Sequence, residues 1–169
     1  MIDGLKFDLR IYVMLAGVDP LRIFLYKEGL GRFATENYSP PRRDNMKNLF
    51  VHLTNYAINK ESEKFQFNED SSVDDVGHKR SLTAVMKQLA DEGNDVNLLM
   101  NRICDLIVKT IITVQPQLAH VYRSSQPDDF ENSMVFELLG FDVLLDYKLR
   151  PFLLEVNHSP SFTTDTPLD

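Results

Sequence analysis

Oxygen-bearing side chains interrupt two apolar runs near the end of the chain. Glu155 and Asn157 lie two residues apart in LLEVNHSPSF (153–162), and Asp142 stands in the apolar run before it. Because strand side chains alternate between faces, Glu155 and Asn157 should share one face, about 6–7 Å apart along the strand. A simpler interpretation is a sheet edge whose polar residues face water. A buried carboxylate, by contrast, needs a partner.

A turn near residue 147 would pair the two runs as antiparallel strands and bring Asp142 opposite residues 153–155. Two carboxylates and an amide oxygen would then converge. Such oxygen ligands suit Mg²⁺, which takes one or two carboxylates together with substrate phosphates and water. Without a cation the like charges would repel each other. The sequence therefore predicts a magnesium site formed by Asp142, Glu155 and Asn157.

A second polar face lies near the beginning of the chain, where Lys6, Asp8 and Arg10 alternate with apolar residues. One interpretation is a surface ladder that neutralises its own charge. The other is a nucleotide contact, with an ammonium for phosphate or base, a carboxylate for ribose hydroxyls and a guanidinium for an oxyanion. Arg32 follows Gly29-Leu30-Gly31, where glycines allow a ligand to approach the backbone closely.

Other polar residues allow both a structural and a functional interpretation. Thr54 and Asn55 suit a turn or strand end as well as a ligand contact, and Tyr56 suits a half-buried aromatic. Cys104, beside an apolar helical stripe, is typical of a buried thiol. The four histidines have no zinc-ligand spacing, and the sequence has no phosphate loop of the P-loop type.

The hydrophobic pattern predicts the elements that would position these residues. Extended segments are expected at 6–18, 21–29, 49–56, 134–145 and 149–157. Ser81 should cap a helix that ends before Gly93, and a longer helix from about Val96 should end or kink at Gln115-Pro116. Strands at both ends with helices between them indicate an α+β or mixed α/β sheet domain.

Composition limits the class of protein. The chain has 169 residues, 43% of them hydrophobic, a formal net charge of −7 and one cysteine. This favours a single globular, partial domain over residues 1–169, with loops at 61–80 and 123–133. The acidic balance argues against nucleic acid as a partner, and the lack of a long apolar stretch argues against a membrane. One cysteine allows no intrachain disulfide and favours an intracellular compartment.

Six runs, taken together and in this order, resemble the tubulin–tyrosine ligase-like family, and its polyglutamylase branch most of all. They are KFDLRIYV (6–13), LYKEGLGRFATE (25–36), HLTNYAINK (52–60), HKRSL (78–82), ELLGFDVLLD (137–146) and PFLLEVNHSPSFTTDTPLD (151–169). The resemblance implies the C-terminal part of an ATP-grasp-like ligase domain, an antiparallel sheet with flanking helices. Such a ligase uses ATP to phosphorylate a carboxylate, and an amine then attacks the acyl phosphate to form an amide.

Carried over position by position, the resemblance implies a nucleotide site at Lys6, Asp8, Thr54 and Asn55. The expected cofactors are ATP and Mg²⁺, with the magnesium ligands at the three positions predicted above.

The resemblance also implies substrate contacts. Arg32 is similar to the residue that binds the incoming amino acid, and Arg10 to an acceptor-tail contact; we treat both as catalytic candidates. Tyr56 and Lys79 are candidates for the glutamate pocket. His158, next to the last metal ligand, suits an acceptor contact that favours elongation of a glutamate chain, or a capping residue before a turn.

The expected substrates are free L-glutamate and the C-terminal tails of tubulin in microtubules. The expected location is the cytoplasm and its cytoskeleton, with the cilium and basal body among the sites. The chain starts at the KFD motif, so half of the ATP clamp should lie upstream and the fragment alone should be inactive. The alternatives are a ligase of the same family with another amino acid or a non-tubulin acceptor, and a truncated, non-catalytic binding module.

Overall fold

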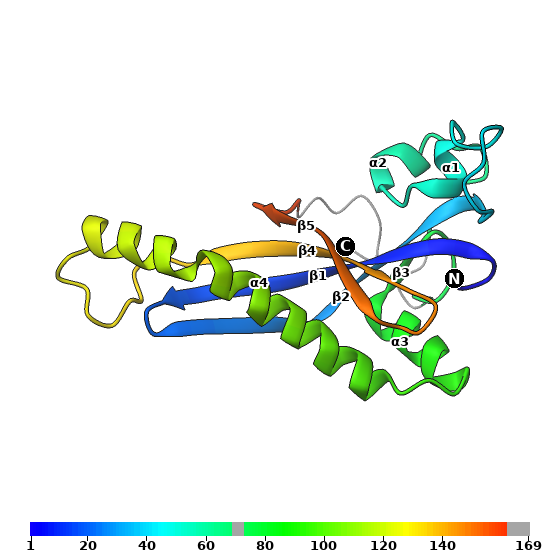
Figure 1. Ribbon diagram of the computed structural model, residues 1–169. Coiled ribbons are helices and arrows are strands. Elements are labelled where there is room, and N and C mark those ends of the chain that lie inside the picture. The colour runs from blue at the N-terminus through cyan, green and yellow to red at the C-terminus, as the bar shows by residue number, and fades with distance from the viewer. Residues whose placement is uncertain (69–72, 162–169) are drawn as a thin grey trace. The chain divides into compact units, whose positions relative to one another are not determined.

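The computed structural model describes residues 1–68 and 73–161 (Figure 1). In chain order the elements are β1 (Leu5–Val18), β2 (Leu21–Asn37), α1 (Leu49–His52), α2 (Tyr56–Asn59), β3 (Lys79–Ser81), α3 (Leu82–Asp91), α4 (Val96–Ser125), β4 (Glu137–Leu145) and β5 (Pro151–His158). The strands form one antiparallel sheet in the order β3-β2-β1-β4-β5. The chain therefore has the predicted α+β fold, an antiparallel sheet with flanking helices.

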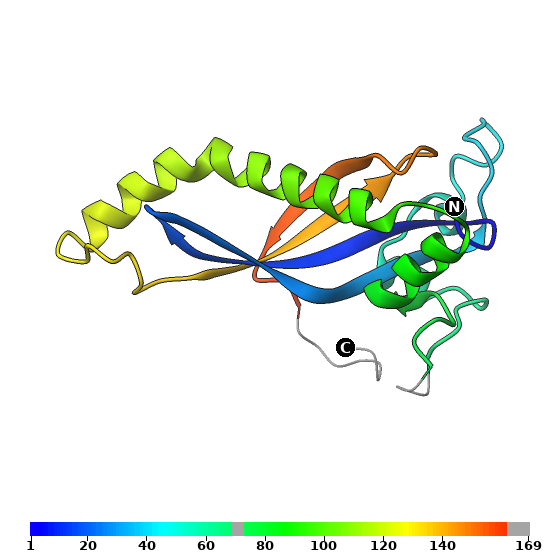
Figure 2. The same ribbon diagram turned by 90° about the horizontal axis from the view of Figure 1, so that it is seen from below.

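The described residues fall into two compact units. The first contains Met1–Arg10 and Glu28–Asn94, and the second contains Ile11–Lys27 and Asp95–Ser161. The first unit holds α1, α2, α3 and β3, and the second holds α4, β4 and β5. In the second unit, α4 packs against β5, as Figure 2 also shows. None of the described helices is both long enough and apolar enough to span a membrane.

The alternating pattern at the start of the chain does form a strand. Phe7, Leu9 and Ile11 are at most 5% exposed, which places one face of β1 in the core. The chain turns at Asp19-Pro20 and returns as β2, so the extended segments expected at 6–18 and 21–29 form a hairpin. β2 is longer than the expected 21–29 and continues to Asn37.

Both long helices begin at the predicted positions. The Ser81 hydroxyl accepts a hydrogen bond from the Ala84 N–H and caps α3, and the Asp95 carboxylate caps α4 in the same way. Of the end or kink expected at Gln115-Pro116, the end is wrong, because α4 continues to Ser125. A proline removes one helical hydrogen bond, but the carbonyl left without its partner belongs to Ile112, which is 53% exposed to water.

The expected strand at 49–56 is also wrong, because this segment forms the short helices α1 and α2. The Asn48 side chain accepts a hydrogen bond from Phe50 N–H and caps α1. Of the three apolar residues that suggested a strand face, only Val51 is buried. The alternation of Leu49, Val51 and Leu53 therefore did not reflect a buried sheet face.

The structure changes the extent of both predicted loops. Lys79 and Arg80 belong to β3, so the loop expected at 61–80 ends before them, and its residues 69–72 lie outside the described residues. The loop expected at 123–133 begins later, because α4 extends to Ser125. The end of the sixth motif, residues 162–169, likewise lies outside the described residues.

Candidate active site

The second unit brings Asp142 and Glu155 directly opposite each other. β4 and β5 pair antiparallel, with Gly140 opposite Asn157, Phe141 opposite Val156, and Asp142 opposite Glu155. Residues directly opposite in an antiparallel pair share a face of the sheet. Two carboxylates therefore project from neighbouring positions on the same face.

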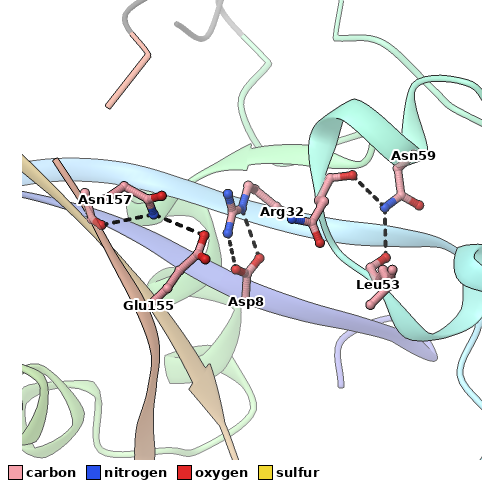
Figure 3. Close-up of polar contacts among 8 residues, drawn as sticks. Asp8, Arg32, Leu53, Asn59, Glu155 and Asn157 are labelled. Carbon is pink, nitrogen blue, oxygen red and sulfur yellow. Dashed lines mark hydrogen bonds and ion pairs between the residues drawn. The ribbon is translucent and has the colours of Figure 1, made fainter. Parts of the chain in front are cut away.

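Asn157 lies on that face as well, one strand period from Glu155. Its side-chain N–H donates to Glu155 Oε1 at 3.2 Å and to the Gly140 carbonyl at 3.4 Å (Figure 3). Asp142 is 2% exposed, whereas Glu155 is exposed and Asn157 is half-buried. We call these three side chains the carboxylate cluster.

A β-bulge lies beside this cluster. The register shifts after Asp142, so that Val143 pairs with Leu153 and Leu154 is the extra residue on β5. Bulges bend a strand and turn its side chains, and they are common next to active sites. Neither segment contains a glycine or proline at this point, so the sequence carried no signal for the bulge.

The donor set of the carboxylate cluster suits a hard divalent cation. Directly opposed like charges destabilise an antiparallel pair, and a cation between the two carboxylates would remove that repulsion. Among residues 1–68 and 73–161 no group of three His, Cys, Asp or Glu side chains could hold a metal ion. The cluster has two carboxylates and an amide, which matches Mg²⁺ bound partly by substrate oxygens and water.

His158 lies on the other side of the sheet. His158 and Val156 both line an apolar cavity of about 840 Å³ in the second unit, together with residues of α4. Strand alternation puts this face opposite to the one that carries Glu155 and Asn157. The structure therefore does not bring His158 into the carboxylate cluster.

In the first unit, Asp8 and Arg32 form an ion pair between β1 and β2. Arg32 Nε donates to Asp8 Oδ1 at 3.1 Å, and its Nη2 contacts Asp8 Oδ2 (Figure 3). The Asp8 side chain is 1% exposed and the Arg32 side chain is 12% exposed. The pair is bidentate and nearly buried, the geometry in which guanidinium–carboxylate contacts are strongest. Arg10, two residues along β1, is half-buried.

Lys79 and Tyr56 meet beside this pair. The register of β2 and β3 places Lys79 opposite Arg32. The Lys79 ammonium lies 5.1 Å from the centroid of the Tyr56 ring, and the residue is only 8% exposed. A cation over an aromatic ring is stabilised by the negative face of the ring. Two cationic side chains, one of them matched by Asp8, therefore share this part of the first unit.

The remaining predicted nucleotide residues lie around the α1–α2 segment of the first unit. Lys6 Nζ donates to the His52 carbonyl at 2.7 Å. Thr54 is 8% exposed, and Asn55 is the exposed residue that precedes α2. A residue that the sequence did not single out, Asn59, is 1% exposed and binds the backbone of this segment. Its position inside the HLTNYAINK run was the one available signal.

The whole chain, residues 1–169, matches the model of the tubulin-tyrosine ligase family. A probable beta-tubulin polyglutamylase of Tetrahymena thermophila is 62% identical over 100% of this chain and 14% of that protein. Tubulin polyglutamylase TTLL6 of Homo sapiens is 51% identical over 100% of this chain and 18% of its own length. Tubulin polyglutamylase TTLL7 of Mus musculus is 46% identical, with the same coverage of 100% and 18%. The chain thus spans less than one fifth of each of these relatives.

Proposed function

Because the chain belongs to the tubulin-tyrosine ligase family, we propose that it forms part of an ATP-dependent ligase that joins glutamate to glutamate side chains on tubulin tails. The names of the relatives, polyglutamylases at 46–62% identity, support this substrate. The reaction forms an amide between the acceptor carboxylate and the amino group of free glutamate. ATP supplies the driving force by phosphorylating the carboxylate.

The opposed pair Asp142–Glu155 is the observation that carries this proposal. Together with Asn157 it would hold Mg²⁺, which supplies positive charge to the ATP phosphates during phosphoryl transfer. The residues' own contribution is geometric. The two strands fix the carboxylates on one face, and the Asn157 N–H orients the exposed Glu155 carboxylate.

We assign Lys6, Asp8, Thr54 and Asn55 to the nucleotide. The structure adds a condition for Asp8, whose two oxygens already accept hydrogen bonds from Arg32. A carboxylate oxygen has more than one lone pair, so Asp8 can accept a ribose hydroxyl while it still orients Arg32. Asp8 would then connect the nucleotide with the residue that we assign to the amino acid.

We assign Arg32, Lys79 and Tyr56 to the incoming glutamate, and Arg10 to the acceptor tail. Glutamate carries two carboxylates, and the first unit places two cationic side chains opposite each other on β2 and β3. Asp8 holds the Nε edge of Arg32, so a substrate carboxylate would bind the guanidinium at another edge. Lys79, held over the Tyr56 ring, would supply the second positive charge.

The parent protein is expected to act on microtubules in the cytoplasm and on those of the cilium. The net charge of −7 gives this chain no attraction for an acidic tubulin tail, so the grip on the tail would come from Arg10 and from other parts of the protein.

Glu155→Gln in the full-length protein tests this assignment. The change keeps the shape of the side chain and removes one of the two negative charges that would hold Mg²⁺, so we expect glutamate ligation to be abolished while the fold survives. Glu137→Gln is the matched control, because Glu137 is an exposed residue of β4 on the opposite face. Normal turnover in the Glu155→Gln protein would refute the metal site.

A further inference from the structure

One buried asparagine holds the segment that carries the proposed nucleotide residues Thr54 and Asn55. Asn59 ends α2 and is 1% exposed. Its Oδ1 accepts the Thr35 N–H of β2 at 3.0 Å. Its Nδ2 donates to the Leu53 carbonyl at 2.8 Å and to the Asn55 carbonyl at 3.1 Å (Figure 3).

These contacts use both the oxygen and the amide hydrogens of the Asn59 side chain. The two carbonyls that it binds belong to the residues directly before and after Thr54. Asn59 therefore fixes the backbone on both sides of Thr54, and the bond from Thr35 ties that backbone to β2. A buried amide with every group paired is rigid, since breaking any of these bonds leaves a polar group unsatisfied.

Two further contacts hold the same region, one in its middle and one at its beginning. Lys6 on β1 donates to the His52 carbonyl at 2.7 Å. Glu36 on β2 accepts from the Asn48 side chain at 2.9 Å, and Asn48 in turn caps α1. Thr35 and Glu36 are consecutive on β2, so adjacent residues of one strand hold the two ends of the α1–α2 segment.

We propose that Asn59 is a positioning residue for the nucleotide site: it orients Thr54 and Asn55 without touching the substrate. This inference rests on the proposed function, which assigns Thr54 and Asn55 to ATP. A site on a short two-helix segment needs such support, because a small misplacement of contact groups can cost a large factor in binding or rate.

Asn59→Asp in the full-length protein tests the role. Aspartate keeps an oxygen for the Thr35 N–H but loses both donors and sets a charge against two carbonyls. We expect the dissociation constant for ATP, measured by calorimetry, to rise roughly tenfold. We also expect faster amide exchange in residues 53–60, while exchange in β1 is unchanged.

Two variants separate positioning from general loss of stability. Thr35→Val removes a buried hydroxyl that finds no hydrogen-bond partner among residues 1–68 and 73–161. It keeps the backbone N–H that binds Asn59, so ATP affinity should not change. Leu89→Ala opens a cavity in the core of the first unit, where Leu89 is 3% exposed. It should lower stability and leave ATP affinity near that of the unmodified protein.

The outcomes distinguish this inference from the function on which it rests. An Asn59→Asp protein that binds ATP as tightly as the Leu89→Ala protein would overturn the positioning role. An unmodified protein that binds ATP but ligates no glutamate would overturn the proposed function, and the ATP affinities would still decide the role of Asn59. An unmodified protein without ATP binding would overturn both.

Discussion

Asp8 and Arg32 neutralise each other across β1 and β2, with Asp8 only 1% exposed and Arg32 12% exposed. A pair of this kind is costly to break from one side, because the remaining buried charge loses the partner that neutralised it. The pair also joins a residue that we assign to ATP to one that we assign to glutamate. Stability and substrate binding should therefore respond together when either residue is changed.

Asp8→Asn should destabilise the first unit by about 3–5 kcal/mol, since Arg32 loses its charged partner. Amide exchange in β1 and β2 as a function of denaturant measures this loss. Asp105→Asn is the control, because Asp105 pairs with Lys109 on the exposed surface of α4, where water screens the charges. An equally small effect of both substitutions would mean that the Asp8 pair contributes no more than a surface contact.

Arg32→Lys should raise the Michaelis constant for glutamate. Lysine keeps the charge but loses the planar fork, and a lost charge-assisted hydrogen bond costs roughly 1.5–3 kcal/mol, about one to two decades in affinity. The constant for ATP should change much less. Arg102→Lys, at an exposed position of α4, provides the control. A parallel rise in the ATP constant would move Arg32 to the phosphates.

His78 should make the first unit less stable in acid. Burial, followed by the positive charge of Arg80, lowers the pKa of His78 below its usual 6.5. The unfolded chain then binds more protons than the folded chain, so stability is lost as the pH falls below about 6.5 and through the lowered pKa. Protonation also removes the lone pair of Nδ1 that accepts the Gln66 N–H at 3.0 Å.

Amide exchange at residues 76–81, corrected for intrinsic rates, reports this effect between pH 7.5 and pH 5. We expect His78→Asn, which keeps an acceptor near the position of Nδ1, to flatten the pH dependence. His120→Asn, on the exposed side of α4, should leave it as steep as in the unmodified protein. A slope that survives in the His78→Asn protein would assign the acid sensitivity to another group.

The strands that carry the carboxylate cluster could be predicted because their side chains follow a period of two and a short turn joins them. That pattern placed Asp142 opposite residues 153–155, and the structure places it opposite Glu155. The segment 49–56 failed on the same rule, since three alternating apolar residues also fit two short helices, the first of them capped by Asn48. Alternation shows which residues share a face, but it does not show that the face is buried.

Other features depend on contacts between distant parts of the sequence. Nothing in the residues around Asn59 distinguishes a buried, fully bonded asparagine from a surface one, because its partner Thr35 lies 24 residues away. The pairing of Asp8 with Arg32 could not be predicted for the same reason, because these two residues also lie 24 positions apart in the sequence. His158 shows the opposite case, because strand alternation alone could have separated it from Asn157.

Binding of a divalent cation by the carboxylate cluster is the central claim, and Mn²⁺ is a direct probe of it because it prefers the same oxygen ligands as Mg²⁺. Electron paramagnetic resonance would count the Mn²⁺ bound to the full-length protein in the presence of a non-hydrolysable ATP analogue. We predict that bound Mn²⁺ in the unmodified protein is lost in the Asp142→Asn, Glu155→Gln double variant and kept in the Glu137→Gln control. Equal Mn²⁺ binding by the double variant and the unmodified protein would contradict the account.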